Sequence, residues 1–145
     1  MDPHILAEKT AIIERHLTRV ADRLPPDPED LTSASDHSDA VILHLWQAVQ
    51  MVIDMASSWC VRSGLGTPNS YADAFIRLAR ARFIPEDLSQ RLVNACGFRN
   101  RIAHAHLHVY GSLDMTLLHA IASTGPDDLR QFLACRTETL SAGAE

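Results

Sequence analysis

One short stretch of the chain concentrates most of its recognisable chemistry. Residues 97–108 hold two arginines, an asparagine and three histidines. Arginine presents a fixed fork of donors that fits phosphate oxygens, and histidine accepts and returns a proton near neutral pH. The combination points to chemistry on a phosphodiester.

The spacing of these residues limits how they can meet. On a straight helix Asn100 and His104 share a face, whereas Arg99 and His104 lie about 140° apart at roughly 100° per residue. The two can work together only if the helix ends or kinks near them, or if a second subunit completes the site.

A metal site is the competing interpretation of the histidines. His104, His106 and His108 stand at alternate positions, and imidazoles two residues apart on a strand can converge on zinc. On a helix they diverge, and neither a cysteine nor a carboxylate stands nearby at ligand spacing. We therefore expect no metal and no other cofactor.

The composition is that of an ordinary globular protein. The chain has 145 residues, of which 46% are hydrophobic and 21% charged, which fits a single domain over residues 1–145. No uninterrupted apolar run reaches the roughly 18 residues of a membrane span, and no signal sequence opens the chain. We expect a cytoplasmic protein without membrane association, whose three widely spaced cysteines are reduced packing residues.

The charge pattern limits any nucleic-acid contact to a small area. A net charge of −5 argues against non-specific electrostatic binding of nucleic acid over a large surface. Between residues 70 and 104, however, six arginines face three acidic residues. Any contact with nucleic acid should be made there.

Hydrophobic residues recur at helical spacing along the chain. The predicted helices run from Ile5 to Leu24, from Ser38 to Arg62, from after Ser70, from Pro85 through the histidine-rich stretch, and from Leu113 to Ala122, followed by a sixth segment from Asp127 to Leu140 beyond Gly125-Pro126. Proline and glycine mark the breaks between them. No segment has the pattern of a strand, so we expect an all-α, up-and-down helical bundle of about five helices.

Two of these helices carry further predictions. The second is expected to be the central core helix, with a polar flank consisting of Gln47, Gln50, Asp54, Ser57 and Ser58. Either this flank is solvated or its aspartate reaches an arginine in a cleft. In the third helix, Ser70 and Asp73 resemble a capping box. Its expected buried face consists of Tyr71, Ala74, Phe75, Leu78 and Ala79.

The sequence Arg-Asn-x-x-Ala-His at residues 99–104, preceded by Gly-Phe, resembles the HEPN superfamily and most closely its HepT-like branch. Two further landmarks stand in the matching order: Ile53-Asp54 in an apolar helix and Ser-Tyr-x-x-Ala-Phe at residues 70–75. The resemblance extends from about Asp39 to Leu107.

This resemblance implies a small helical bundle that forms a homodimer, with a metal-independent ribonuclease site near the dimer interface. Family members are toxins of toxin–antitoxin pairs, restrained by an MNT-type nucleotidyltransferase. Arg99 and His104 match the catalytic pair, with Arg99 holding the scissile phosphate and His104 moving protons at the RNA 2′-hydroxyl and the leaving oxygen. Asn100 matches the polar residue that follows the arginine and is expected to orient His104 or the phosphate. Arg101 and His106 are expected substrate contacts.

The chain departs from the HepT-like pattern at His106. In that pattern a tyrosine commonly lies two residues after the catalytic histidine, and the nucleotidyltransferase places AMP on its hydroxyl. Tyr110 stands four residues further on, too far to inherit a role that depends on close positioning. We expect neutralisation by docking or by modification elsewhere, with His106 lining the RNA site.

A binding module is the alternative from another functional class. Such a chain would dock its nucleotidyltransferase and present a nucleotide or substrate, without catalysis of its own. Activity of the isolated chain separates the two interpretations.

Overall fold

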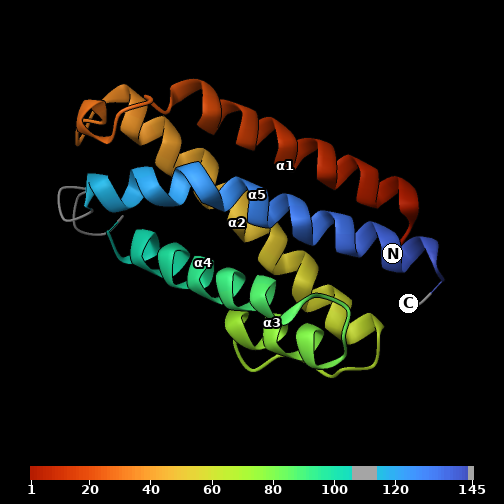
Figure 1. Ribbon diagram of the computed structural model, residues 1–145. Helices are drawn as coiled ribbons and strands as arrows, with labels where there is room; N and C mark the ends of the chain where they lie inside the picture. The colour runs from red at the N-terminus through yellow and green to blue at the C-terminus, as the bar shows by residue number, and fades with distance from the viewer. Residues whose placement is uncertain (106–113, 144–145) are drawn as a thin grey trace.

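The computed structural model describes residues 1–105 and 114–143, with the backbone alone for residues 104 and 105. This part of the chain is built of helices and contains no strand, which confirms the predicted all-α fold (Figure 1). The elements are α1 (Pro3–Arg23), a short 3₁₀ turn η1 (Pro28–Asp30), α2 (Asp36–Arg62), α3 (Tyr71–Arg80), α4 (Glu86–Ala105) and α5 (Met115–Ser141).

Local capping signals explain where α2 and α3 begin. Ser35 and Ser38 form a reciprocal capping box, so α2 starts at Asp36, two residues earlier than predicted. Ser70 caps α3 by accepting a hydrogen bond from the Asp73 amide at 3.0 Å. The Asp73 carboxylate does not return this bond to Ser70 but accepts one from the Asn69 amide at 2.8 Å, so only half of the predicted capping box forms.

The long helix α2 is the centre of the bundle, as predicted. It contacts each of the other four helices of the described chain, and twelve of its residues are buried. By length and composition alone α2 could cross a membrane, but a core helix passes the same test. Its burial among the other helices identifies it as the core helix of this bundle.

An aromatic cluster ties α2 to its neighbours. The Trp59 ring stacks on Phe83 at a centroid distance of 5.4 Å and meets Phe132 edge-on at 5.8 Å. Phe75 of α3 also packs edge-on against Phe132, at 5.8 Å. Such pairs stabilise a core by about 0.5–1.5 kcal/mol beyond their buried area. The cluster therefore fixes α3 and α5 against the second half of α2.

The C-terminal region forms one helix, where the sequence predicted a break at Gly125-Pro126. Pro126 is buried inside the continuous helix α5. A proline normally disfavours helical geometry in the preceding residue by clashing with its Cβ, but Gly125 has no Cβ. In the turn before the proline, Ser123 and Thr124 donate hydrogen bonds to backbone carbonyls four residues earlier. The predicted separate fifth and sixth segments are therefore wrong.

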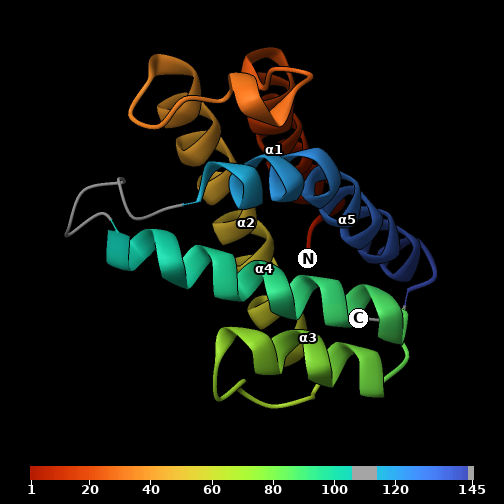
Figure 2. The same ribbon diagram turned by 60° about the vertical axis from the view of Figure 1, so that its left-hand side comes forward.

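Three helices meet where the arginine-rich stretch lies. Helix α3 lies alongside α4, and both pack on α2 (Figure 2). This arrangement brings the start of α3 and the later turns of α4 to the polar flank of α2.

Candidate active site

Arg99 connects α4 to α2 through a chain of hydrogen bonds. Its Nε donates to Oε1 of Gln50 at 2.7 Å. The Gln50 amide nitrogen in turn donates to Oδ1 of Asp54 at 3.0 Å. Gln50 and Asp54 are four residues apart and so share one face of α2. The guanidinium of Arg99 is thus held at its Nε side by a glutamine that is itself oriented by a carboxylate.

Two aromatic rings add to the positioning of Arg99. Its guanidinium carbon lies 5.0 Å from the centroid of Tyr71 and 6.0 Å from that of Trp46. At exposed sites such cation–π contacts are worth about 0.5–1 kcal/mol each. Nη1 also donates to Oδ1 of Asn100 at 3.3 Å, while Nη2 has no hydrogen bond within the described residues. Among the described side chains, only Asn100 occupies the Nη edge, and Nη2 could bind an anion.

The structure resolves the two alternatives for the polar flank of α2. Asp54 makes no direct ion pair with Arg99 within the described chain, and its link to the arginine runs through Gln50. Asp54 itself is exposed to solvent, as the first alternative proposed, and the direct contact with Arg99 is made by the neutral amide of Gln50.

The backbone geometry of His104 is defined, although its side chain lies outside the described residues. Helix α4 continues from Arg99 through His104 and ends at Ala105. No helix end separates the two residues, so their angular offset of about 140° is retained in the backbone. His106 lies outside the described residues altogether.

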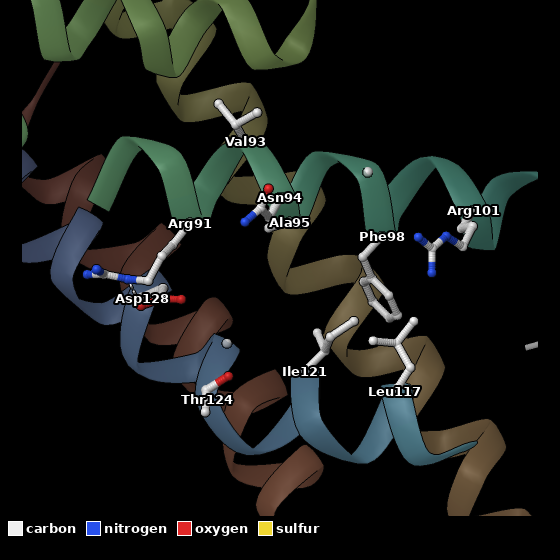
Figure 3. A pocket seen from close by; sticks show the side chains of 12 residues that line it. Arg91, Val93, Asn94, Ala95, Phe98, Arg101, Leu117, Ile121, Thr124 and Asp128 are labelled. Carbon is white, nitrogen blue, oxygen red and sulfur yellow. Dashed lines mark hydrogen bonds and ion pairs between the residues drawn. The ribbon is translucent and has the colours of Figure 1, made fainter. Parts of the chain in front are cut away.

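Arg101 lies in a different groove, between α4 and α5 (Figure 3). This groove has a volume of about 510 Å³, with Phe98 and Leu117 in its wall near Arg101. At its other end Arg91 donates to Asp128 at 2.8 Å. The structure therefore places Arg99 beside Asn100 but does not bring Arg101 to them.

A second groove, of about 750 Å³, lies beside Arg99. Its lining comes from the second half of α2, the loop before α3, the first turn of α3 and the middle of α4. Tyr71 and Asn100, both in contact with Arg99, belong to this lining. The groove, whose volume is large enough for a nucleotide, thus adjoins two neighbours of Arg99, although the arginine itself is not among its lining residues.

Comparison with known proteins decides the family. The model of the ribonuclease HepT-like family matches residues 13–135. The mRNA nuclease HepT of Shewanella oneidensis is 30% identical over 129 residues, covering 89% of this chain and 93% of the relative. The chain belongs to the HepT-like ribonuclease family.

Solved structures agree with this assignment. A tri-AMPylated Shewanella oneidensis HEPN toxin in complex with MNT antitoxin superposes with a TM-score of 0.80 at 27% identity, covering 95% of this chain and 99% of that one. A toxin–antitoxin structure with AMP-PNP gives a TM-score of 0.81 at 27% identity, covering 93% and 98% of the two chains. The helical bundle of this chain is therefore the fold of HEPN toxins.

The cysteines of this HepT-like chain are packing residues, as the sequence indicated. All three thiols are free, and burial raises the pKa of each, to about 11 for Cys96. Cys96 lines the groove beside Arg99, but at neutral pH it is a protonated thiol rather than a nucleophile.

The carboxylates, thiols and imidazoles of the described residues form no cluster of three or more that could hold a metal ion. The side chains of His104, His106 and His108 fall outside that description.

Three residues in contact with Arg99 were not identified from the sequence as its partners. Gln50 was one of several polar flank residues, and Trp46 belonged to the apolar stripe of α2. Tyr71 was assigned to the buried face of the third helix, but it is 39% exposed and contacts Arg99. Its position directly after the N-cap Ser70, where a helix end reaches the surface, was the signal for this exposure.

Proposed function

We propose that this HepT-like ribonuclease is a metal-independent endoribonuclease toxin that cleaves RNA with Arg99, Asn100 and His104. The observation that supports this most directly is the geometry of Arg99. Its Nε is fixed by Gln50, its guanidinium lies over the rings of Trp46 and Tyr71, and within the described residues Nη2 makes no hydrogen bond. That arrangement suits a planar fork binding two oxygens of one phosphate.

The proposed reaction uses the 2′-hydroxyl of the substrate as nucleophile. His104 accepts the proton of this hydroxyl as the 2′-oxygen bonds to phosphorus, and a protonated imidazole donates to the departing 5′-oxygen. Arg99 stabilises the charge that develops on the non-bridging oxygens. Asn100, which already accepts a bond from Arg99, keeps that side chain in place. RNA is required because DNA lacks the nucleophile.

The proposal includes a homodimer. Since α4 is continuous between Arg99 and His104, the two backbone positions lie about 140° apart around one helix. A two-fold axis near the end of α4 would bring the arginine of one subunit towards the histidine of the other, and two-fold pairing is the commonest arrangement of identical subunits.

We further propose that an MNT-type nucleotidyltransferase is the antitoxin and that the pair acts in the cytoplasm. The support is that a similar solved toxin, from Shewanella oneidensis, is in complex with MNT antitoxin. That toxin is tri-AMPylated, whereas this chain has His106 where HepT-like proteins commonly have a tyrosine. Docking, or modification at another residue, is therefore the proposed mode of control. His106 and the exposed Arg101 are assigned to outer contacts with RNA.

The decisive experiment measures cleavage of RNA by the purified chain in the presence of a chelator. Arg99→Ala should lower the rate about a hundredfold or more, as loss of a stabilising donor does, and His104→Ala by a factor on the order of 10²–10⁴. Arg80→Ala is the matched control, since Arg80 is exposed and has no ion pair within the described chain.

Activity that requires a metal, or that survives both substitutions, contradicts the mechanism. A chain that binds its nucleotidyltransferase yet leaves RNA intact would instead be the docking module considered above.

A further inference from the structure

The groove of about 750 Å³ beside Arg99 has features that the phosphate chemistry leaves unexplained. In the proposed mechanism, Arg99, Asn100 and His104 hold and cleave a phosphodiester of any sequence. The groove adds an aromatic ring, several polar side chains and a glycine in its wall.

Tyr71 links the groove to the phosphate-binding residue. The ring lies 5.0 Å from the Arg99 guanidinium carbon. Tyr71 is 39% exposed and is one of the residues that line the groove. A phosphate bound to the open edge of Arg99 would therefore place its nucleotide close to this ring. Aromatic rings are the usual platforms on which proteins stack unpaired bases.

Polar side chains in the groove have unused hydrogen-bonding capacity. The side chains of Ser57, Thr67 and Asn69 form no hydrogen bond within residues 1–105 and 114–143. A serine hydroxyl and an asparagine amide each offer both a donor and an acceptor, which is what the edge of a nucleobase requires. They come from α2 and from the loop before α3, so they approach the groove from two sides.

Gly97 leaves the α4 wall of the groove open. A Cβ added at this position would meet no atom within 4 Å. Crowding by the rest of the protein therefore does not explain why this residue is a glycine. Glycine in the middle of a helix costs about 1 kcal/mol relative to alanine. A small residue here keeps space beside Tyr71 and Asn100 for a flat ligand.

We propose that this groove is a nucleobase subsite, which holds the base of a nucleotide adjoining the scissile phosphate. The base stacks on Tyr71, and its edge faces Ser57 and Asn69. Because a base can enter the groove only when it is unpaired, the substrate class is single-stranded RNA or a loop. This inference rests on the proposed ribonuclease function and adds to it the selection of the cleavage site.

The test is a cycle of enzyme and substrate changes. Cleavage of a short RNA by wild-type protein is mapped, and the same RNA is made with an abasic residue at each nucleotide flanking the cut. One abasic position should lower kcat/KM about tenfold or more, within the range of losses seen when base stacking is removed. Tyr71→Ala should cause a similar loss on the intact RNA and little further loss on that abasic RNA.

This non-additivity separates base stacking from support of Arg99. If Tyr71 only positions the arginine, its removal lowers cleavage of intact and abasic RNA by the same factor, and the inference fails. It also fails if no abasic position affects the wild-type protein. Tyr71→Phe keeps the ring and should retain the base dependence.

Matched variants test the polar edge and the open wall. Ser57→Ala and Asn69→Ala should change which base is preferred at that position, whereas Ser58→Ala and Asn94→Ala, which lie outside this groove, should not. Gly97→Leu should weaken binding of a non-cleavable 2′-deoxy-substituted RNA about tenfold or more while leaving helical content intact. Unchanged base preference in the first pair would overturn the subsite, as would unchanged binding by Gly97→Leu.

The Arg99→Ala variant keeps this test distinct from that of the proposed function. If Arg99→Ala cleaves RNA at close to the wild-type rate, the catalytic proposal fails whatever Tyr71 does. If Arg99→Ala loses the expected hundredfold or more and the cycle is additive, the catalytic proposal stands and only the base subsite fails.

Discussion

Because Gln50 accepts the hydrogen bond from Arg99, we predict that changing Gln50 lowers activity even though Gln50 does not touch the substrate. Gln50→Leu keeps a side chain of similar size on the same face of α2 but removes the acceptor of the 2.7 Å bond. The guanidinium would keep its neighbours Trp46 and Tyr71 and lose the contact that fixes its rotation. We expect a folded protein whose Arg99 no longer presents its open edge in one orientation.

The size of the effect follows from the kind of bond lost. A hydrogen bond to a charged group contributes about 1.5–3 kcal/mol, and part of this is recovered when water solvates a half-exposed arginine. Since about 1.4 kcal/mol corresponds to a tenfold change in rate, kcat/KM should fall about ten- to a hundredfold. Asp54→Ala removes only the carboxylate that orients Gln50, so its effect should be several times smaller.

The assay compares kcat/KM on one defined RNA with the free energy of unfolding measured by denaturant. Gln47→Leu is the matched control, because Gln47 is a half-buried glutamine on the same helix with no hydrogen bond in the described structure. Activity of Gln50→Leu within about twofold of wild type would refute the positioning role, since even one charge-assisted bond should cost more than that. Equal losses in the two leucine variants would assign the effect to α2 packing instead.

Three further predictions concern assembly, pH and control. Light scattering at micromolar concentration should give the mass of a dimer; a monomer would contradict the proposed shared site. The Nδ1 atoms of His16 and His44 lie 3.0 Å apart. Burial lowers the pKa of both imidazoles from 6.5, and the nearby charge of Arg19 lowers both further. The pKa of His16 is also lowered by the His44 imidazole. The unfolded chain therefore binds protons first as the pH falls below 6.5, so thermal stability should decrease there, and His44→Gln should flatten that decrease. After incubation with the nucleotidyltransferase and ATP, intact-mass spectrometry and peptide mapping should show no AMP on Tyr110. An AMP adduct on Tyr110 that abolishes cleavage would contradict the proposal that the chain is controlled by docking or by modification at another residue.

Much of the fold was predictable because its boundaries depend on nearby residues. Prolines after α1, the serine caps of α2 and α3 and the apolar stripe of α2 act over a few positions, and each appears in the structure within about two residues. The error at Pro126 has the opposite cause. Whether a proline interrupts a helix depends on the residue before it and on tertiary packing, and here Gly125 and burial allow α5 to continue.

The candidate site was predictable only in part, for a related reason. Arg99, Asn100 and His104 lie within six residues and carry a motif, whereas Gln50 lies 49 positions before Arg99. A polar residue beside an apolar stripe has the same sequence pattern whether it faces water or an arginine of another helix. Helical periodicity gives the direction of a side chain around its own axis, but the identity of its partner depends on how helices pack.

The polar flank of α2 nevertheless carries more information than its solvated interpretation allowed. Gln50, Asp54 and Ser57 are spaced four and three residues apart, so they form one row on the helix. In a central helix, such a row interrupts surface that would otherwise bury apolar side chains; here Gln50 and Ser57 are half-buried and Asp54 is exposed. Gln50 holds Arg99, Asp54 orients Gln50, and Ser57 lines the adjoining groove. A polar row on the most buried helix of a small bundle is therefore evidence for a site, and the arginine that completes it should be sought on a neighbouring helix.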